Sequence, residues 1–446
     1  MMTRKPNWAA MAVALLLTTQ LQAQTTHEFT AVQSSDYARK NNVQVKNAIL
    51  NLKIQEQVNR GITAAALPNL SGSISVTDNL KIATQLLPGE FFGQPPGTFV
   101  PVRFGTKYNA NAGLALNQLL FDGQVFVGLQ ARRASLDFQQ KNVELTEETI
   151  KKNIHKIYYQ LVVAKKQVEL LDANIDRMVK LQHDTKEIFK NGFAEKLDVD
   201  KLEVQMANLQ TQKLKVISSI EAGYLGLKVL MGMPLKDSLV LTESITDEKL
   251  KEGLLDDGKY DYKNRKDFQY LNLATALREY NVRRYKLSYI PTLSFSANSS
   301  YSAQRSTFDF THKSGTWFPS TFISFRLNVP IFSGYSRAAS LQQARLELEQ
   351  SQNTLENLKL AIDNDVEQAK LSYRTAISTI DFQKKNMTLA ETVYGQTKKK
   401  YEIGTGSNTE ITAAQTELVM AQTNYISALY DAIIARIDYM AAIGKL

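Results

Sequence analysis

The side chains that could do chemistry are scattered along the sequence and form no recognisable site. The four histidines, His27, His155, His183 and His312, each stand alone, and cysteine is absent. We find no nucleophile elbow, phosphate loop or cluster of metal ligands, and Gly404-Thr405-Gly406 is too short to cradle a phosphate. The sequence therefore predicts a protein that is not an enzyme and that holds no cofactor and no metal.

Composition limits how the chain can meet a membrane or a partner. Without cysteine, a disulfide scaffold and a lipid-modified cysteine are excluded, so any membrane attachment must be non-covalent. The net charge of +9 comes from lysines spread among glutamates in long helical segments. This pattern indicates solvated helix faces, and we expect no nucleic-acid partner.

The N-terminus has the features of an export signal. Arg4 and Lys5 are basic, Ala9 to Leu17 is an uninterrupted apolar run of nine residues, and Ala23 is a small residue suited to cleavage. We expect residues 1–23 to be a signal peptide. No later segment approaches the ~20 apolar residues of a membrane-spanning helix, so the exported chain is either soluble or part of a β-barrel.

Self-comparison shows a duplication. Four motifs recur in order: Pro68–Ser71 as Pro291–Ser294, Phe121–Gly123 as Phe332–Gly334, Lys190–Gly192 as Glu402–Gly404, and Leu230–Gly232 as Ala442–Gly444. The last three pairs are offset by 211, 212 and 212 residues. We expect a first repeat over 24–232, a linker forming a belt outside the helices over 233–263, and a second repeat over 264–446. Each repeat reads as a helix, a strand pair, a very long helix, a glycine turn and a return helix, with extra length in the loop of the first strand pair.

The predicted strands alternate strictly between apolar and polar residues. The apolar positions are Tyr108, Ala110, Ala112, Leu114 and Leu116 in the first repeat, and Leu293, Phe295, Ala297, Tyr301, Ile323, Phe325, Leu327 and Val329 in the second. Such alternation fits strands with one lipid face and one lumen face, although a half-buried sheet in a soluble sandwich shares it.

The number of strands decides between these two interpretations. Four strands per chain can neither form a sandwich alone nor close a barrel, which needs about eight, so an oligomer is required. Two chains would give eight strands and three would give twelve. The polar inward Ser, Asn, Thr and Gly residues suit a water-filled lumen, which favours twelve.

The predicted helices are too long for a compact domain. Gly123 to Lys190 contains no proline, which allows a helix of roughly 100 Å. Within it Ile150, Ile154, Ile157, Leu161, Ala164, Val168, Leu171, Ile175 and Met178 keep a four-three spacing. This spacing predicts a coiled-coil seam. We expect reversals at Gly192 and Gly404, with both hairpins projecting to the same end.

At this point the chain resembles the TolC-like outer membrane efflux family over nearly its whole mature length. The residues that carry the resemblance are Asn264–Asp267, Tyr289–Ser294, Val329–Gly334 and Tyr401–Thr405. The resemblance implies an α+β membrane protein: a homotrimer with a 12-stranded outer-membrane β-barrel, four strands per chain, continuous with a periplasmic α-helical coiled-coil tunnel. It also implies docking to a periplasmic adaptor and an inner-membrane transporter, in the Gram-negative outer membrane.

The resemblance also implies where the sites lie. The tips that would meet the adaptor match Asn191, Gly192, Phe193 and Ala194 in the first repeat, and Ile403, Gly404, Thr405 and Gly406 in the second. The first tip departs from the family because Asn191 and Phe193 replace smaller or aliphatic residues. Glu410 matches an acid that would form a constricting ring, and Asp198 is its counterpart.

Two alternatives remain open at this stage. Asp198 and Glu410 both fall in the first turn of a predicted helix, where an acid interacts favourably with the helix dipole, so their role could be structural. For the whole chain, a periplasmic coiled-coil tether without a pore would explain the helices. It would leave the four amphipathic strands without a role, so we expect an efflux or type I secretion duct whose cargo the sequence does not reveal.

Overall fold

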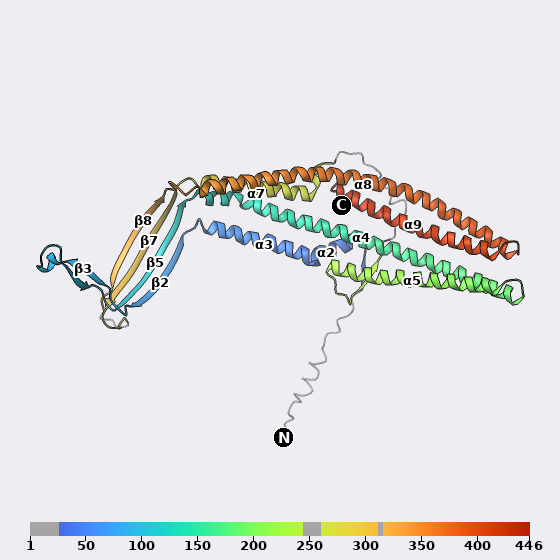
Figure 1. Cartoon of the computed structure of the whole chain (residues 1–446), viewed down its shortest axis with the longest axis horizontal. Coiled ribbons are helices and arrows are strands. Elements are labelled where there is room, and N and C mark those ends of the chain that lie inside the picture. The colour runs from blue at the N-terminus through green and yellow to red at the C-terminus, as the bar shows by residue number, and fades with distance from the viewer. Residues whose placement is uncertain (1–25, 244–259, 311–314) are drawn as a thin grey trace, which may run out of the picture. The chain divides into compact units, whose positions relative to one another are not determined.

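The computed structural model describes residues 26–243, 260–310 and 315–446 (Figure 1). They form two compact units, each built from separate stretches of chain. A helical unit comprises residues up to 50, 140–270 and 356–446, and a sheet unit comprises 51–139 and 271–355. The predicted signal peptide 1–23 and the linker residues 244–259 lie outside the described residues. No described helix is long and apolar enough to cross a membrane.

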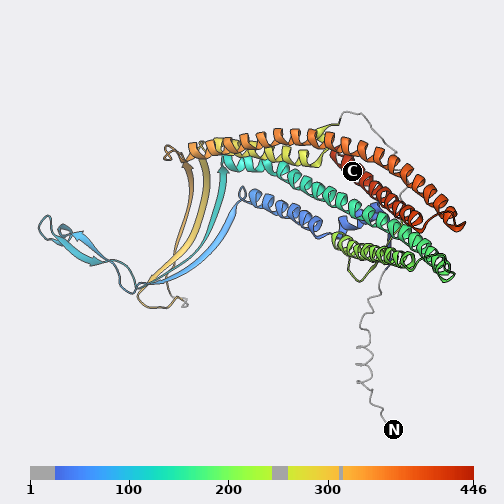
Figure 2. The same ribbon diagram turned by 45° about the vertical axis from the view of Figure 1, so that its right-hand side comes forward.

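Two helical hairpins dominate the helical unit. The first consists of α4 (Gly123–Lys190), whose later part lies in this unit, and α5 (Lys196–Met231); the second consists of α8 (Ser336–Glu402) and α9 (Asn408–Ala442). The 68 residues of α4 confirm the predicted helix end to end. Figure 2 shows the helices following one another as α5, α4, α9 and α8 across a layer, and side-chain contacts join successive neighbours.

All four long-helix ends that the repeat predicts have the same backbone closure. Gly192, Gly232, Gly404 and Gly444 adopt left-handed φ angles of 79°, 69°, 78° and 71°. In each case the residue after the glycine donates a backbone hydrogen bond five residues back, as Phe193 does to the Ile188 oxygen at 3.0 Å. This double closure is the Schellman motif, which glycine fits because it lacks a Cβ. The duplication is confirmed at these positions.

The cores of the two repeats also coincide. At the same offset of 212, the buried pairs are Ile150 and Ile362, Ile154 and Val366, Leu161 and Tyr373, Val199 and Ile411, Leu202 and Ala414, and Met206 and Leu418. The smaller alanines in α9 let its neighbours approach closely, as the seam predicts. The apolar seam therefore locates the core correctly in both hairpins.

The helical unit contains one feature that the sequence did not reveal. Strand β1 (Thr26–Phe29) pairs in parallel with β6 (Ser238–Leu241), and the Tyr158 hydroxyl donates to the Phe29 oxygen at 2.9 Å. The helix α2 (Ala31–Asn41) follows β1 and is capped by Thr30. Part of the predicted linker is thus a strand partner of the N-terminal segment, while η2 (Tyr262–Asn264) leads into α7 (Lys266–Leu287).

The sheet unit holds the ends of α3 (Val43–Ala64) and α7 with a four-stranded antiparallel sheet. Its order is β2 (Asn69–Asp78), β5 (Tyr108–Phe121), β7 (Thr292–Arg305) and β8 (Phe318–Asn328). The strand register confirms the predicted alternation, because the apolar residues of all four strands share one face. They are Leu70, Ile74, Val76, Ala110, Ala112, Leu114, Leu116, Phe295, Ala297, Tyr301, Ile323, Phe325 and Leu327. Val329, also predicted, lies one residue beyond the strand.

The extra length in the first strand pair is a hairpin rather than a plain loop. Strand β3 (Thr84–Pro88) pairs antiparallel with β4 (Phe99–Arg103), and η1 (Gly89–Phe92) joins the turn between them. The second strand pair has only residues 306–317 at the matching position. This inserted hairpin is the largest difference between the repeats.

Candidate aperture and docking tips

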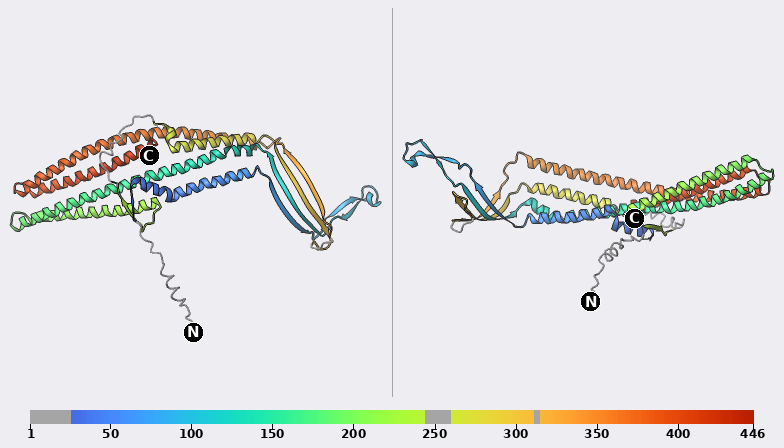
Figure 3. Two further views of the ribbon diagram at one scale, coloured as in Figure 1. Left: turned by 180° about the vertical axis from the view of Figure 1, so that it is seen from behind. Right: turned by 90° about the horizontal axis from the view of Figure 1, so that it is seen from below.

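The two turns between the long helices expose small and apolar residues. Phe193 is 86 % exposed and Ile403 is 73 % exposed. A Cβ added at Gly192 or Gly404 would meet no neighbouring atom, so only the left-handed φ requires glycine there. Exposed apolar side chains on rigid closures are suited to bind a partner, because little conformational entropy is lost. Figure 3 shows both turns at one end of the helical unit.

Polar contacts inside each turn fix its shape. The Asn191 amide donates to the Glu187 oxygen at 2.8 Å, and the Thr405 hydroxyl donates to the Lys400 oxygen at 3.2 Å. Gly406 lies so close to the backbone of Tyr401 that a Cβ there would stand 3.0 Å from its nitrogen. Ala194, by contrast, is half-exposed and contributes its small size only.

Asp198 is used by the end of its own helix. Its carboxylate accepts a hydrogen bond from the Glu195 backbone nitrogen at 3.4 Å and lies 4.0 Å from the Lys201 ammonium. Both contacts belong to the first turn of α5, where they satisfy a free N–H group and oppose the helix dipole.

Glu410 differs, although its sequence context is the stronger capping signal. Ser407-Asn408-Thr409-Glu410 has the spacing of a capping box, in which the glutamate would bond back to the cap. The Ser407 hydroxyl accepts from the Glu410 backbone nitrogen at 3.1 Å, but the return bond is not formed. Among the described residues the Glu410 carboxylate has no hydrogen bond or ion pair, and it is exposed. It is therefore free to act on something outside the chain.

Behind the tips, polar contacts join the two hairpins. The hydroxyls of Thr185 and Tyr401 lie 2.9 Å apart, with Thr185 fully buried. Further along, the buried Asn174 amide donates to Gln422 at 2.7 Å and its oxygen accepts from Gln415 at 3.2 Å. Sequence reasoning missed these residues because it counted only apolar seam positions. The signal was present, since Gln415 and Gln422 directly follow the seam alanines 414 and 421.

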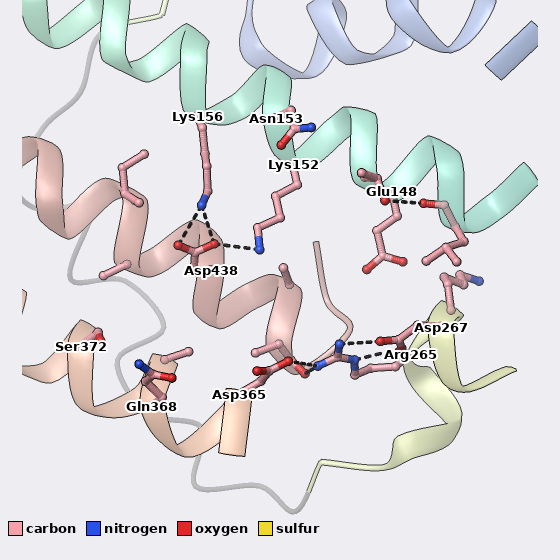
Figure 4. A pocket seen from close by; sticks show the side chains of 18 of the residues that line it. Glu148, Lys152, Asn153, Lys156, Arg265, Asp267, Asp365, Gln368, Ser372 and Asp438 are labelled. Carbon is pink, nitrogen blue, oxygen red and sulfur yellow. Dashed lines mark hydrogen bonds and ion pairs between the residues drawn. The ribbon is translucent and has the colours of Figure 1, made fainter. Parts of the chain in front are cut away.

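A polar groove of about 860 Å³ lies among α4, α8, α9 and the start of α7 (Figure 4). Asp438 accepts from Lys152 and Lys156, at 2.9 and 2.7 Å. Burial alone would raise the pKa of Asp438, but the two lysines outweigh it and hold this pKa below its ordinary value. Arg265 bridges Asp267 at 2.6 Å and Asp365 at 3.5 Å.

These paired charges make the groove a structural feature. Burial, and then the charge of Asp267, raises the pKa of Glu148 at the edge of the groove. Among the described residues no group of three or more His, Cys, Asp or Glu side chains could hold a metal ion. The arrangement supplies ion pairs between helices and no nucleophile beside a base.

Comparison with known proteins agrees with this architecture. Residues 262–445 match the family model described as outer membrane efflux protein. The chain is 20 % identical over 346 residues to the outer membrane protein TolC of Vibrio cholerae, a match that covers 75 % of this chain and 77 % of that protein.

Solved structures share the fold at low sequence identity. The outer membrane protein VceC of Vibrio cholerae is 16 % identical, with a TM-score of 0.74 over 93 % of this chain and 96 % of its own. The Campylobacter jejuni CmeC outer membrane channel is 17 % identical, with a TM-score of 0.73 over 93 % and 85 %. The amphipathic sheet, the duplicated hairpins and these matches together identify the chain as a TolC-like member of the outer membrane efflux protein family, a protein of the Gram-negative outer membrane.

Proposed function

We propose that three copies of the chain form the exit duct of a tripartite efflux or type I secretion system, a passive channel fed by an inner-membrane transporter through a periplasmic adaptor. The observation that carries the proposal is the sheet with one continuous apolar face, one polar face and two edge strands, β2 and β8, that pair with no strand among the described residues. In lipid such edges must be paired. Joining β2 of one copy to β8 of the next closes the sheet, and three copies give twelve strands.

The dimensions of the sheet suit a membrane. Strand β8 has 11 residues, which is about 37 Å at about 3.4 Å per residue, and a tilt of about 40° shortens the span to about 28 Å. Aromatic side chains stand at both ends of the strands. Phe121, Phe126, Phe332 and Tyr335 lie at one end and Tyr108, Phe308, Phe310 and Trp317 at the other. Such girdles are typical of outer-membrane barrels.

The helical unit supports the same assembly. Leu360, Leu371, Phe382 and Val393 recur every 11 residues on α8 and are exposed, and α5 exposes Leu197, Val204, Leu214, Leu225 and Val229. These two helices are the outer members of the helical layer (Figure 1). Packing α8 of one copy on α5 of the next would cover both stripes and continue the layer into a closed tunnel. A tether without a pore leaves the sheet's polar face and edges unexplained.

The tips and Glu410 supply the proposed sites of this duct. The exposed Phe193 and Ile403 turns would dock the adaptor. Three free Glu410 carboxylates would form an acidic ring at the narrow end, which repels anions and favours cations. Asp198 would act chiefly at the end of its helix.

The channel is tested with the purified full-length protein. We expect a heat-sensitive trimer on gels and discrete conductance steps in a planar bilayer. A monomer that gives no conductance would overturn the proposal.

The mode of assembly is tested by Leu389→Arg, which puts a charge among the apolar stripe residues of α8. Leu389 is exposed in one chain, so the monomer should still fold while trimers are lost. The matched control is Thr388→Arg, an exposed neighbour rotated about 100° around the helix. Equal loss of trimers in both variants would contradict α8 packing on another copy.

A further inference from the structure

The hairpin inserted between β2 and β5 carries an apolar face that nothing in the chain covers. The register of β3 with β4 places Leu86 opposite Pro101 and Pro88 opposite Phe99 on one face. Leu86 is 65 % exposed and Phe99 is 62 % exposed. An isolated two-stranded hairpin is marginally stable in water. This one therefore needs a partner surface for its apolar side.

The hairpin is nevertheless rigid in itself. At the turn, Gly89 donates to the Thr98 oxygen at 2.7 Å, and the Thr98 hydroxyl donates to the Pro95 oxygen at 2.7 Å. Two glycines with positive φ, Gly93 and Gly97, close the turn and leave Phe91 exposed beside it. An ordered apolar surface of this kind loses little entropy on binding, which is the property of a docking element.

The base of the hairpin is fastened to the end of the main sheet. The Asn79 backbone nitrogen donates to the Lys107 oxygen at 2.7 Å, its side-chain amide donates to the Thr106 oxygen at 3.0 Å, and the Thr106 hydroxyl donates to Asn109 at 2.8 Å. The hairpin thus leaves the sheet directly beside the last residues of the edge strand β2.

The opposite edge of the sheet carries a second uncovered apolar group at the same end. Strand β8 begins at Phe318, which pairs with Ser302, close to where Tyr108 pairs with Arg305. Phe318 and Phe308 are both more than half exposed, and Phe308 packs edge-on against Tyr108 at 5.6 Å. Within one chain this group is separated from β2 by the width of β5 and β7.

Closing the sheet between copies brings these two groups together. Neighbouring strands lie about 4.8 Å apart, and a five-residue strand is about 17 Å long. A hairpin that starts beside β2 can therefore reach across β8 of the next copy. Resting on the proposed trimer, we infer that the hairpin is an intersubunit clasp whose Leu86, Phe99 and Phe91 pack on Phe308 and Phe318 of the adjacent copy at the rim of the barrel.

Cross-linking tests the clasp, because the natural chain contains no cysteine. Leu86→Cys with Phe318→Cys, treated with a short bifunctional maleimide, should give covalent dimers and trimers on denaturing gels. The matched control, Gln85→Cys with Phe318→Cys, uses the adjacent exposed residue on the other face of the hairpin and should give far less.

The outcomes separate this inference from the proposed function. Native trimers with no cross-linked ladder, or an equal ladder in the control, would overturn the clasp and leave the duct intact. A protein that forms no trimer would overturn both. To test a lipid partner instead, Leu86→Cys labelled with a fluorophore is placed in vesicles of brominated phospholipid. Strong quenching would overturn the clasp, and weak quenching with a ladder would support it.

A second variant reports on stability rather than chemistry. Leu86→Ser with Phe99→Ser should lower the temperature at which trimers dissociate, while Gln85→Ser should leave it unchanged. An unchanged dissociation temperature in the double variant would contradict a clasp that holds subunits together.

Discussion

The first hairpin turns at Gly192 and the second at Gly404, with φ angles one degree apart and the same pair of backbone hydrogen bonds. The acids that follow these turns behave differently. Asp198 is engaged by Glu195 and Lys201, whereas Glu410 leaves its carboxylate unbound. Duplication has preserved the backbone closure in both repeats, and the side chains on it have diverged. Function is therefore better sought in what the two repeats do not share.

The largest effect is expected at the exposed turns themselves. Gly404→Glu and Gly192→Glu each place a charge on an apolar tip that the proposal assigns to the adaptor, and both also strain a left-handed residue. We expect cross-linking to the adaptor to be abolished while trimers persist. If only one variant loses cross-linking, the two tips are not equivalent docking sites.

Strain is separated from charge by Gly404→Asn, since asparagine tolerates the left-handed region. This variant should retain most of the cross-linking. Complete loss would show that the glycine backbone, rather than an uncharged tip, is what the adaptor requires.

A second effect concerns His155 of α4, whose counterpart in α8 is the exposed Glu367. Burial, and then the charge of Lys151, lowers the pKa of His155 to about 4 from an ordinary 6.5. The folded state thus resists protonation. Stability should fall as pH drops from 6.5 toward 4, by about 2–3 kcal/mol per chain at pH 4.5.

Urea unfolding at pH 7.5 and pH 4.5 measures this loss. His155→Gln should remove most of the difference between the two pH values, whereas Glu367→Gln should keep it. An unaltered pH dependence in His155→Gln would show that other groups cause the acid sensitivity.

The third prediction tests the different use of the two acids. Glu410→Ala should raise resting conductance and weaken block by divalent cations, because it removes the proposed ring charge. Asp198→Ala should change neither, and should instead destabilise its helix end by about 1 kcal/mol. Planar-bilayer recordings and urea midpoints distinguish these results. Equal conductance changes in both variants would break the comparison.

The smallest effect is expected for the contact between the hairpins. Tyr401→Phe removes the hydrogen bond to the buried Thr185 and should cost about 0.5–1.5 kcal/mol. Tyr394→Phe is the control, because this tyrosine lies on the same helix and its hydroxyl has no hydrogen-bond partner among the described residues. A similar loss in both variants would assign the effect to packing.

Long-range periodicity made the fold predictable where one pattern persisted over many residues. The α4 seam and the glycines at its end gave the helix its true bounds, because each turn added an independent signal. Strand β1 has four residues and its partner lies beyond α5, so no local pattern identified it. The β3–β4 hairpin was expected only as loop length, since Pro88 and Pro101 obscure its alternation.

The candidate sites were predictable only in position. The sequence placed Asp198 and Glu410 after equivalent turns but could not tell which carboxylate is engaged. Indeed, Ser407-Asn408-Thr409-Glu410 carries the stronger capping signal, and yet it is Asp198 that bonds back to the helix start. Side-chain geometry decides between two contacts of nearly equal free energy, and such small differences are not recorded in residue types.

The pairing of β1 with β6 gives the chain a timetable. Strand β1 is among the first described segments to follow the signal region, and its partner Ser238 stands 212 residues after Thr26. During export the first repeat therefore remains open at one end until almost all of it has crossed the inner membrane. Closing so long a loop costs entropy before any contact repays it, and non-local pairing slows folding. The exported chain must thus wait, unfolded in part, and the periplasm must keep it soluble for that interval.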